Sequence, residues 1–216
     1  MNKQTASFLF LLVVALMQCG IAQNAYQIPF ASAGNAIELT VANTAKTPLA
    51  GVKVTATDIP MWLRFAETEQ QIALLKPEQE VATTFTFTVD KNAPVQKSNT
   101  LKFLITGPGG EQWEKEITVA VAPPDKFEAY QNFPNPFNPT TAISFQLSAV
   151  SRVSLRIYNM LGQEVALLVD GDRSAGYHQE TWDAARYSSG VYVYQLIATD
   201  ERGQKQTARK RMLLLK

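Results

Sequence analysis

The run NFPNPFNP at residues 132–139 constrains the fold more than any other feature of this sequence. Three of its residues are prolines, each of which fixes the backbone angle φ and lacks an N–H donor. A residue that precedes a proline is also biased toward extended backbone angles. The run therefore predicts a stiff, extended segment that is neither a helix nor a central strand. It divides the chain into one β-rich part before it and another after it.

Residues 1–22 have the pattern of a cleaved secretory signal peptide. Lys3 supplies a positive start, Phe8–Met17 is an unbroken apolar run, and the small residues Gly20 and Ala22 suit cleavage after Ala22. The apolar run is about half the roughly 20 residues that a membrane-spanning helix needs, which favours a signal peptide over a retained transmembrane helix. We expect the Sec translocon and signal peptidase to act on this segment and the mature chain to begin at Gln23.

The only cysteine of the chain, Cys19, leaves an alternative open. Leu16–Cys19 resembles a lipoprotein signal, in which the cysteine is acylated. In the main interpretation Cys19 leaves with the signal peptide, and the exported chain then has no disulfide and no cysteine metal ligand. Its stability would come from core packing.

The composition describes a globular protein without a charge signature for a particular partner. Hydrophobic residues make up 46% of the chain and charged residues 18%, and the net charge is +1. This balance does not indicate nucleic-acid binding or attraction to an anionic membrane.

Residues 23–122 show the period-two alternation of half-buried strands. Gly107–Gly110 predicts the turn of a hairpin between the last two strands. Short strands at this spacing predict a β-sandwich. The alternating segments are 37–41, 52–57, 85–89, 101–105 and 113–121.

Four short stretches mark the same part of the chain: Val41–Thr44, Pro60–Trp62, Leu75–Glu80 and Asp90–Pro94. Their order resembles the immunoglobulin-like modules of bacterial surface proteins, of the CARDB and NEW-repeat kind. The resemblance implies an adhesive or structural immunoglobulin-like domain over residues 23–122.

Three aromatic residues, Trp62, Phe65 and Trp113, could bind a ligand by stacking on sugar rings. In a small sandwich, aromatic residues near strand ends more often belong to the core, and we favour that interpretation. Glu67 and Glu69 could form a carboxylate pair, but their polar neighbours indicate a solvated face.

Pro123 and Pro124 predict an extended linker at residues 123–128 between the two parts. The second part again shows strand alternation, and Ile143, Phe145 and Leu147 are expected to face inward. Residues 191–198 carry apolar or aromatic side chains on both faces, which predicts a central strand with tyrosine hydroxyls reaching its rim. The expected strands are 141–147, 153–157, 164–169, 177–182, 191–198 and 207–215, with polar loops at 170–176 and 183–190.

Six motifs follow one another in the second part of the chain: Tyr130–Thr141, Ile157–Val165, Ala175–His178, Trp182-Asp183, Ser189–Tyr194 and Lys210–Lys216. Together they resemble the C-terminal sorting domain of the type IX secretion system, which has a FlgD-type immunoglobulin-like fold. The resemblance covers residues 129–216. It implies passage through the outer membrane by the type IX translocon, followed by removal of the domain by a sorting peptidase and release of the cargo or its attachment to surface lipopolysaccharide.

The candidate recognition residues lie in these motifs. For contact with the secretion machinery we select Gly190, Val191, Tyr192, Lys210, Arg211 and Lys216. The opening motif contributes Asn132, Pro134, Asn135, Pro136, Phe137, Asn138 and Pro139. A purely structural alternative is that Gly190 permits a turn and Leu213–Leu215 belongs to the core.

The sequence contains few of the residues that catalysis commonly uses. His178 is the only histidine, so a histidine-cluster metal site cannot form. It falls on an expected strand of the second part, where we predict a structural or surface role rather than a place in a catalytic triad. Loop oxygens could bind calcium, but their spacing differs from an EF-hand. We therefore predict an all-β, non-enzymatic protein without cofactor or metal, secreted or held at the cell surface. A carbohydrate-binding accessory module is the alternative, and a hydrolase based on scattered carboxylates is a third possibility. The candidate calcium ligands are Asp170, Asp172, Asp183, Asn135 and Asn138.

Overall fold

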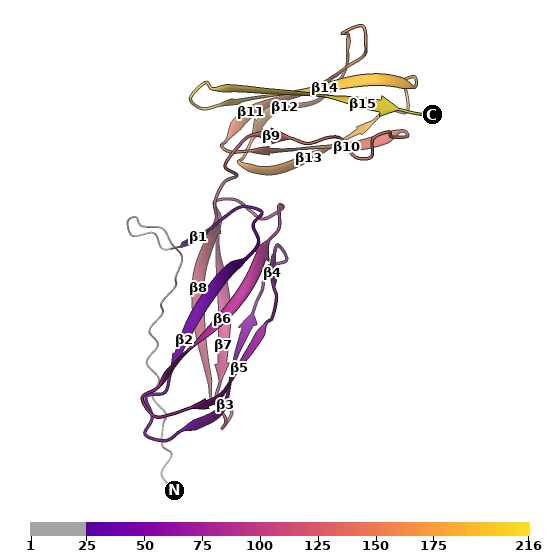
Figure 1. Cartoon of the computed structure of the whole chain (residues 1–216). Helices are drawn as coiled ribbons and strands as arrows, with labels where there is room; N and C mark the ends of the chain where they lie inside the picture. The colour runs from indigo at the N-terminus through magenta and orange to yellow at the C-terminus, as the bar shows by residue number, and fades with distance from the viewer. Residues whose placement is uncertain (1–24) are drawn as a thin grey trace. The chain divides into compact units, whose positions relative to one another are not determined.

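The computed structural model describes residues 25–216. The predicted signal peptide, its cleavage site after Ala22 and Cys19 lie outside this range. All regular elements of the described residues are β-strands, which confirms the predicted all-β class (Figure 1). The chain divides into two compact units, with the boundary between Ala122 and Pro123.

The N-terminal unit consists of two sheets. The larger sheet has the strand order β1-β8-β7-β3-β5, and the smaller sheet has the order β2-β6-β4. The strands are β1 (Tyr26–Ile28), β2 (Asn35–Ala42), β3 (Leu49–Thr57), β4 (Leu63–Phe65), β5 (Glu69–Leu75), β6 (Glu80–Val89), β7 (Ser98–Thr106) and β8 (Gln112–Val121).

The alternation in the sequence correctly predicts β2, β3, β6, β7 and β8, including the β7–β8 hairpin. In the hairpin turn the backbone N–H of Gly107 donates to the carbonyl of Glu111 at 2.8 Å. Gly110 has a φ of +85°, which favours glycine because it has no Cβ. The alternation does not predict β1, β4 and β5. Two of these have only three residues, and β5 is an edge strand in which only Ile72 and Leu75 are buried, so its alternation is weak.

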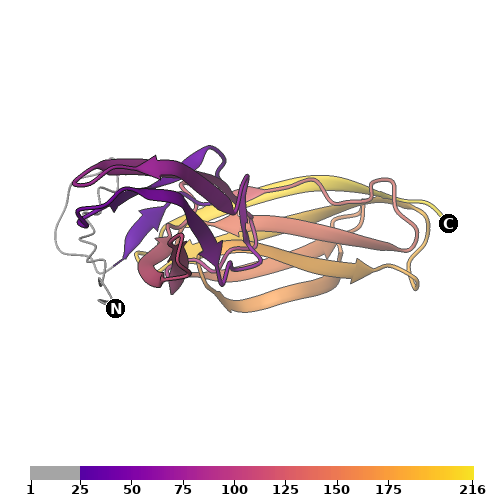
Figure 2. The same ribbon diagram turned by 90° about the horizontal axis from the view of Figure 1, so that it is seen from below.

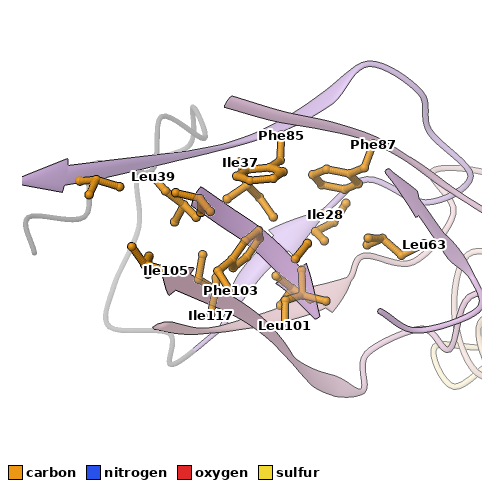
Figure 3. Close-up of a cluster of buried hydrophobic side chains, with 14 of the residues drawn as sticks. Ile28, Ile37, Leu39, Leu63, Phe85, Phe87, Leu101, Phe103, Ile105 and Ile117 are labelled. Atoms are coloured by element: carbon orange, nitrogen blue, oxygen red, sulfur yellow. The ribbon is translucent and has the colours of Figure 1, made fainter. Parts of the chain in front are cut away.

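The core of this unit lies between its two sheets. Phe85 of the smaller sheet packs on Phe103 of the larger sheet, with ring centroids 5.1 Å apart, and both side chains are fully buried. Burial of such a side chain contributes roughly 1.5–3 kcal/mol. Figure 3 shows how the side chains of the two sheets face one another: Ile37, Leu39, Phe85 and Phe87 on one side, and Leu101, Phe103, Ile105 and Ile117 on the other.

The C-terminal unit is a second pair of sheets, with the strand orders β13-β10-β9 and β12-β11-β14-β15. In Figure 2 the orange and yellow strands of this unit run roughly along one common direction, and the C-terminus lies at one end of them. The strands are β9 (Glu128–Ala129), β10 (Thr140–Leu147), β11 (Ser151–Tyr158), β12 (Glu164–Arg173), β13 (Gly176–Asp183), β14 (Gly190–Asp200) and β15 (Lys205–Leu214).

The inward residues of β10 are those that the alternation predicts, since Ile143, Phe145 and Leu147 are all buried. The predicted polar loop at 170–176 is wrong over most of its length. β12 continues to Arg173 because its polar residues still pair with β11, up to Ser151 opposite Arg173. Polar side chains are compatible with a strand here because β12 is a sheet edge that faces solvent.

The prediction of a central strand at 191–198 is confirmed, since β14 lies between β11 and β15. Its two faces differ, however. Tyr194 and Leu196 are fully buried, whereas Val193 is half-buried on the outer face. The expectation that the tyrosine hydroxyls reach the rim is wrong for Tyr194, whose hydroxyl donates to the carbonyl of Tyr130 at 2.6 Å. Burial raises the pKa of the Tyr194 hydroxyl because the charged phenolate would lose its hydration.

The residues predicted as a linker are structured at their C-terminal end. Phe127 packs against the hydrophobic core of the C-terminal unit, and Glu128 pairs with Gln146 of β10. Pro124 is buried. The C-terminal unit thus begins several residues before the proline motif.

Candidate functional site

The proline motif, residues 132–139, contains no helix and no strand, as its prolines predict. The prediction of an extended segment is wrong, because the backbone bends at residues 134–136 and 138–139. The buried side chain of Asn132 stabilises the motif by hydrogen bonds, and only 2% of its surface is exposed. Its amide nitrogen donates to the carbonyl of Pro134 at 3.0 Å and to the hydroxyl of Thr141 at 2.9 Å. The Thr141 hydroxyl in turn donates to the same Pro134 carbonyl at 2.8 Å. The Phe133-Pro134 and Asn135-Pro136 peptide bonds are both cis.

Phe137 joins the motif to the end of β15. Its backbone N–H donates to the carbonyl of Leu213 at 3.0 Å, and its carbonyl accepts from the N–H of Leu215 at 3.0 Å. The side-chain oxygen of Asn135 accepts from the N–H of Leu213 at 2.9 Å. The motif therefore covers the C-terminal part of the β15 edge, which its position in the sequence does not reveal.

An aromatic cluster supports this junction from the core. The ring of Phe137 lies 5.4 Å from that of Trp182, and Trp182 also contacts Tyr187 and Tyr192 at 5.6 and 5.2 Å. The hydroxyl of Tyr187 donates to the carbonyl of Val165 at 2.6 Å. Phe137 thus packs on Trp182, which in turn packs on two tyrosines whose hydroxyls are hydrogen-bonded to backbone carbonyls.

The start of β14 and the end of β15 complete the same end of the unit. Gly190 pairs with Leu214, and Tyr192 pairs with Met212. Gly190 has a φ of +154°, which favours glycine, although a Cβ at this position would meet open space. The structure thus brings the opening motif, residues 190–192 and residues 212–215 together. We call this assembly the motif end of the unit.

The final residue is also held in place. The backbone N–H of Lys216 donates to the hydroxyl of Ser189 at 3.0 Å, and its ammonium group donates to the carbonyl of Ala185 at 2.7 Å. The last residues are therefore part of the folded unit.

The candidate recognition residues differ in their exposure. Arg211 and Lys216 are exposed, whereas Gly190, Val191 and Lys210 are half-exposed and Tyr192 is buried. In the opening motif, Asn132 and Phe137 are buried, Pro139 is half-buried, and Pro134, Asn135, Pro136 and Asn138 are exposed. Phe133, which is not among the candidate recognition residues, has 80% of its surface exposed. The exposure of this side chain could not be predicted from the sequence, because the motif lacks the period-two alternation that distinguishes inward from outward residues in a strand.

The three aromatic candidates of the N-terminal unit are half-buried and pack against its core. Phe65 lies 5.5 Å from Phe87 and 6.1 Å from Phe85, ring centroid to ring centroid. Phe65 belongs to β4 and Trp113 to β8, which are in different sheets. Trp62 precedes β4, and its carbonyl accepts from the N–H of Asp90 at 2.8 Å.

The acidic and histidine candidates have local partners. Glu69 forms an ion pair with Lys53 at 3.1 Å, and Glu67 accepts from the amide of Gln70 at 2.9 Å. His178 stacks on Phe145, and its Nε2 lies 2.8 Å from the carbonyl oxygen of Ser174.

The five candidate calcium ligands are not gathered into one cluster. Asp170 pairs with Arg152 at 3.3 Å, and Asp183 accepts from the N–H of Ala185 at 2.9 Å. Residues 25–216 contain no group of three or more acidic, histidine or cysteine side chains placed to hold a metal ion. Over the same residues no helix has the length and apolar character that a membrane span requires.

Residues 131–210 match the family model described as a secretion system C-terminal sorting domain. No curated protein matches the chain. The match defines the C-terminal unit as a sorting domain of the type IX secretion system, as the motifs predict. The chain is thus a protein that this domain directs to the cell surface or into the medium.

The chain is also similar to three solved structures at low identity. The CupB2 chaperone of Pseudomonas aeruginosa is 12% identical, with 87% of this chain and 97% of that chain covered and a TM-score of 0.30. The dimeric latent PorU of Porphyromonas gingivalis is 11% identical, with 97% of this chain and 20% of that chain covered and a TM-score of 0.36. The E. coli chaperone DraB is 14% identical, with 96% and 97% covered and a TM-score of 0.32. At such values a shared function does not follow.

Proposed function

We propose that the type IX translocon recognises the motif end of the C-terminal unit as a folded surface. The observation that carries this proposal is the hydrogen bonding of Asn135 and Phe137 to Leu213 and Leu215. These bonds unite two motifs that are far apart in the sequence into one structural element. Exposed Pro134, Pro136 and Arg211 then contact the machinery, while buried Asn132 and Tyr192 hold the surface in shape.

The N-terminal unit is the cargo in this proposal. It is an immunoglobulin-like module with an adhesive or structural role and without enzymatic activity. Its buried hydrophobic core and its locally paired carboxylates, such as Glu69 with Lys53, support a role in contact rather than in catalysis.

The route of export completes the proposal. The Sec translocon and signal peptidase process residues 1–22, and the type IX translocon moves the folded chain across the outer membrane. A sorting peptidase then removes the C-terminal unit, and the cargo is released or joined to lipopolysaccharide.

The test is export in a host with a working type IX system. Deletion of residues 129–216 is expected to retain the cargo in the periplasm, which fractionation and surface labelling measure. A matched point variant, Pro136→Ala, is expected to reduce export, while Lys97→Ala in the N-terminal unit serves as the control. Surface exposure of the truncated chain at the normal level would refute the proposal.

A second candidate for the cargo is a carbohydrate-binding module, because Trp62 and Trp113 both keep part of their side chains exposed. Aromatic faces of this kind can stack on sugar rings. The full chain would be applied to a glycan array and compared with Trp62→Ala and Trp113→Ala. Absence of binding by the unmodified chain would exclude this candidate and leave the adhesive proposal in place.

A further inference from the structure

The two edges of the four-stranded sheet in the C-terminal unit are built differently. β15 pairs with β14 without a register shift, from Lys205 opposite Thr199 to Leu214 opposite Gly190. On the opposite edge, the pairing of β12 with β11 is interrupted twice by irregularities. Bulges twist an edge and discourage the addition of another strand. β15 has no such protection, and its segment contains neither glycine nor proline.

The backbone groups of β15 alternate in direction. Leu213 and Arg211 direct theirs away from β14, since the Leu213 N–H donates to Asn135 and the Arg211 carbonyl accepts from the Gln131 amide at 2.7 Å. The period of two in a strand gives Lys205, Thr207 and Arg209 the same outward direction. Nothing within residues 25–216 hydrogen-bonds to these outward groups of the three residues. The motif end and Gln131 therefore cover the β15 edge from Arg211 to Leu214, whereas the outward backbone groups of Lys205, Thr207 and Arg209 have no hydrogen-bond partner among the described residues.

This edge of β15 carries positive charge from the uncovered residues to Arg211, the first covered one. Lys205, Arg209 and Arg211 alternate along one exposed face of β15. Among the described residues, no carboxylate lies within 4.0 Å of their charged nitrogens. Arg209 has a neutral neighbour instead, because the Gln195 amide oxygen, oriented to accept, lies 2.9 Å from Nη2 and 3.2 Å from Nε.

The cations of β11, which is separated from β15 by β14, are compensated. Arg152 pairs with Asp170 at 3.3 Å, and Arg156 pairs with Glu164 at 2.6 Å. Both carboxylates come from β12 on the far side of the sheet. The uncompensated charge of this face is thus confined to the strand whose backbone is also unpaired.

We propose that residues 205–211 of β15 bind an extended acidic segment of a protein of the secretion machinery, which adds to the sheet as a further strand. This inference rests on the proposed sorting function and names the partner's chemistry. The outward backbone groups supply the hydrogen bonds of strand addition, and acidic side chains opposite Lys205, Arg209 and Arg211 supply selectivity. A second copy of β15 would place like charges opposite one another, which disfavours self-pairing.

The test uses the purified full chain and a labelled peptide of about eight residues that alternates valine and glutamate, the minimal form of such a segment. A peptide that alternates valine and lysine is the matched control. Fluorescence anisotropy is expected to show binding of the acidic peptide at least about tenfold tighter than binding of the basic one. Amide exchange measured by NMR is expected to slow at Lys205, Thr207 and Arg209 when the acidic peptide binds.

Two variants separate strand addition from simple charge attraction. Thr207→Pro removes an outward N–H that makes no bond to β14, so the sheet itself remains intact. The peptide loses one hydrogen bond, and the proline ring keeps it from approaching β15 closely at that position. We expect a loss of affinity of about tenfold or more, with Thr207→Val binding as the unmodified chain does. Lys205→Glu combined with Arg209→Glu is expected to reverse the preference toward the basic peptide. Thermal unfolding checks that each variant is folded, and if Thr207→Pro is not, the exchange pattern of the unmodified chain decides.

Four results of these binding and association experiments would overturn the inference. Undiminished binding by folded Thr207→Pro would exclude strand addition, and so would protection of amides outside residues 205–211. Binding to vesicles rich in anionic phospholipid that exceeds binding to the peptide would indicate a lipid surface instead. Self-association in sedimentation that disappears in Arg209→Glu would indicate a second copy.

The export assay distinguishes a failure of this inference from a failure of the proposed sorting function. If deletion of residues 129–216 stops export and folded Thr207→Pro is exported normally, the strand-addition inference fails and the sorting function stands. If the truncated chain is exported, the sorting function fails whichever peptide binds.

Discussion

The three asparagines of the proline motif allow a sharp test of how the motif is held, because the same side chain has three different environments. Asn132 is buried, donates to two oxygens and accepts from the amide of Gln131. Asn135 is exposed and accepts one backbone N–H, and Asn138 is exposed with no hydrogen bond to the described residues. Replacement of each by alanine removes the same atoms. Any difference among the three variants therefore reports the environment.

The expected magnitudes follow from the hydrogen bonds. Each bond contributes about 0.5–1.5 kcal/mol, so Asn132→Ala should lower the free energy of unfolding of the C-terminal unit by about 2 kcal/mol. For a unit of about 90 residues this corresponds to a fall of roughly 8–16 °C in Tm. Asn135→Ala should cost about 1 kcal/mol, and Asn138→Ala should stay within about 0.5 kcal/mol of the unmodified chain.

Differential scanning calorimetry of the full chain measures these effects. The two units are expected to unfold in separate transitions, and only the transition of the C-terminal unit should move. Fluorescence of Trp182, the one tryptophan in that unit, assigns the transition when Trp62 and Trp113 are replaced by phenylalanine. Equal Tm values for Asn132→Ala and Asn138→Ala would refute the argument that the buried amide organises the motif.

Three further predictions concern stability. Burial raises the pKa of the Tyr194 hydroxyl above its unfolded value of about 10, so the stability gained from the neutral, buried hydroxyl is complete below that pH and is lost as the pH rises above it. Tyr194→Phe should therefore reduce the fall in unfolding free energy at alkaline pH, measured by urea unfolding, and an unchanged fall would contradict this assignment. Phe85→Ala should destabilise the N-terminal unit by about 3–5 kcal/mol because the ring is fully buried. Met61→Ala, whose side chain is 96% exposed, should have almost no effect on the unfolding of the same unit, and similar Tm shifts for the two variants would count against the described core. Glu69→Gln should change stability by no more than about 0.5 kcal/mol in chemical denaturation, since both partners of its ion pair with Lys53 are half-exposed, and a larger loss would show a role beyond this pair.

The sequence by itself determined the class of the fold and most of its strands. Period-two alternation marks most strands with one buried and one solvated face, as in Ile143, Phe145 and Leu147 of β10. It also determined that residues 132–139 interrupt the sheets, because proline removes donors wherever it stands. The sorting-domain motifs could likewise be read from the sequence, since they occur in a fixed order along the chain.

Only the tertiary structure decided which motifs meet. Phe137 lies more than 70 residues before Leu213, and no local pattern shows that their backbones are hydrogen-bonded. The same holds for the strand order, which leaves β15 at an edge and so makes the charges of Lys205 and Arg209 an uncompensated column. Strand pairing and burial depend on contacts between distant segments, and side-chain alternation carries no information about the partner that a strand will find.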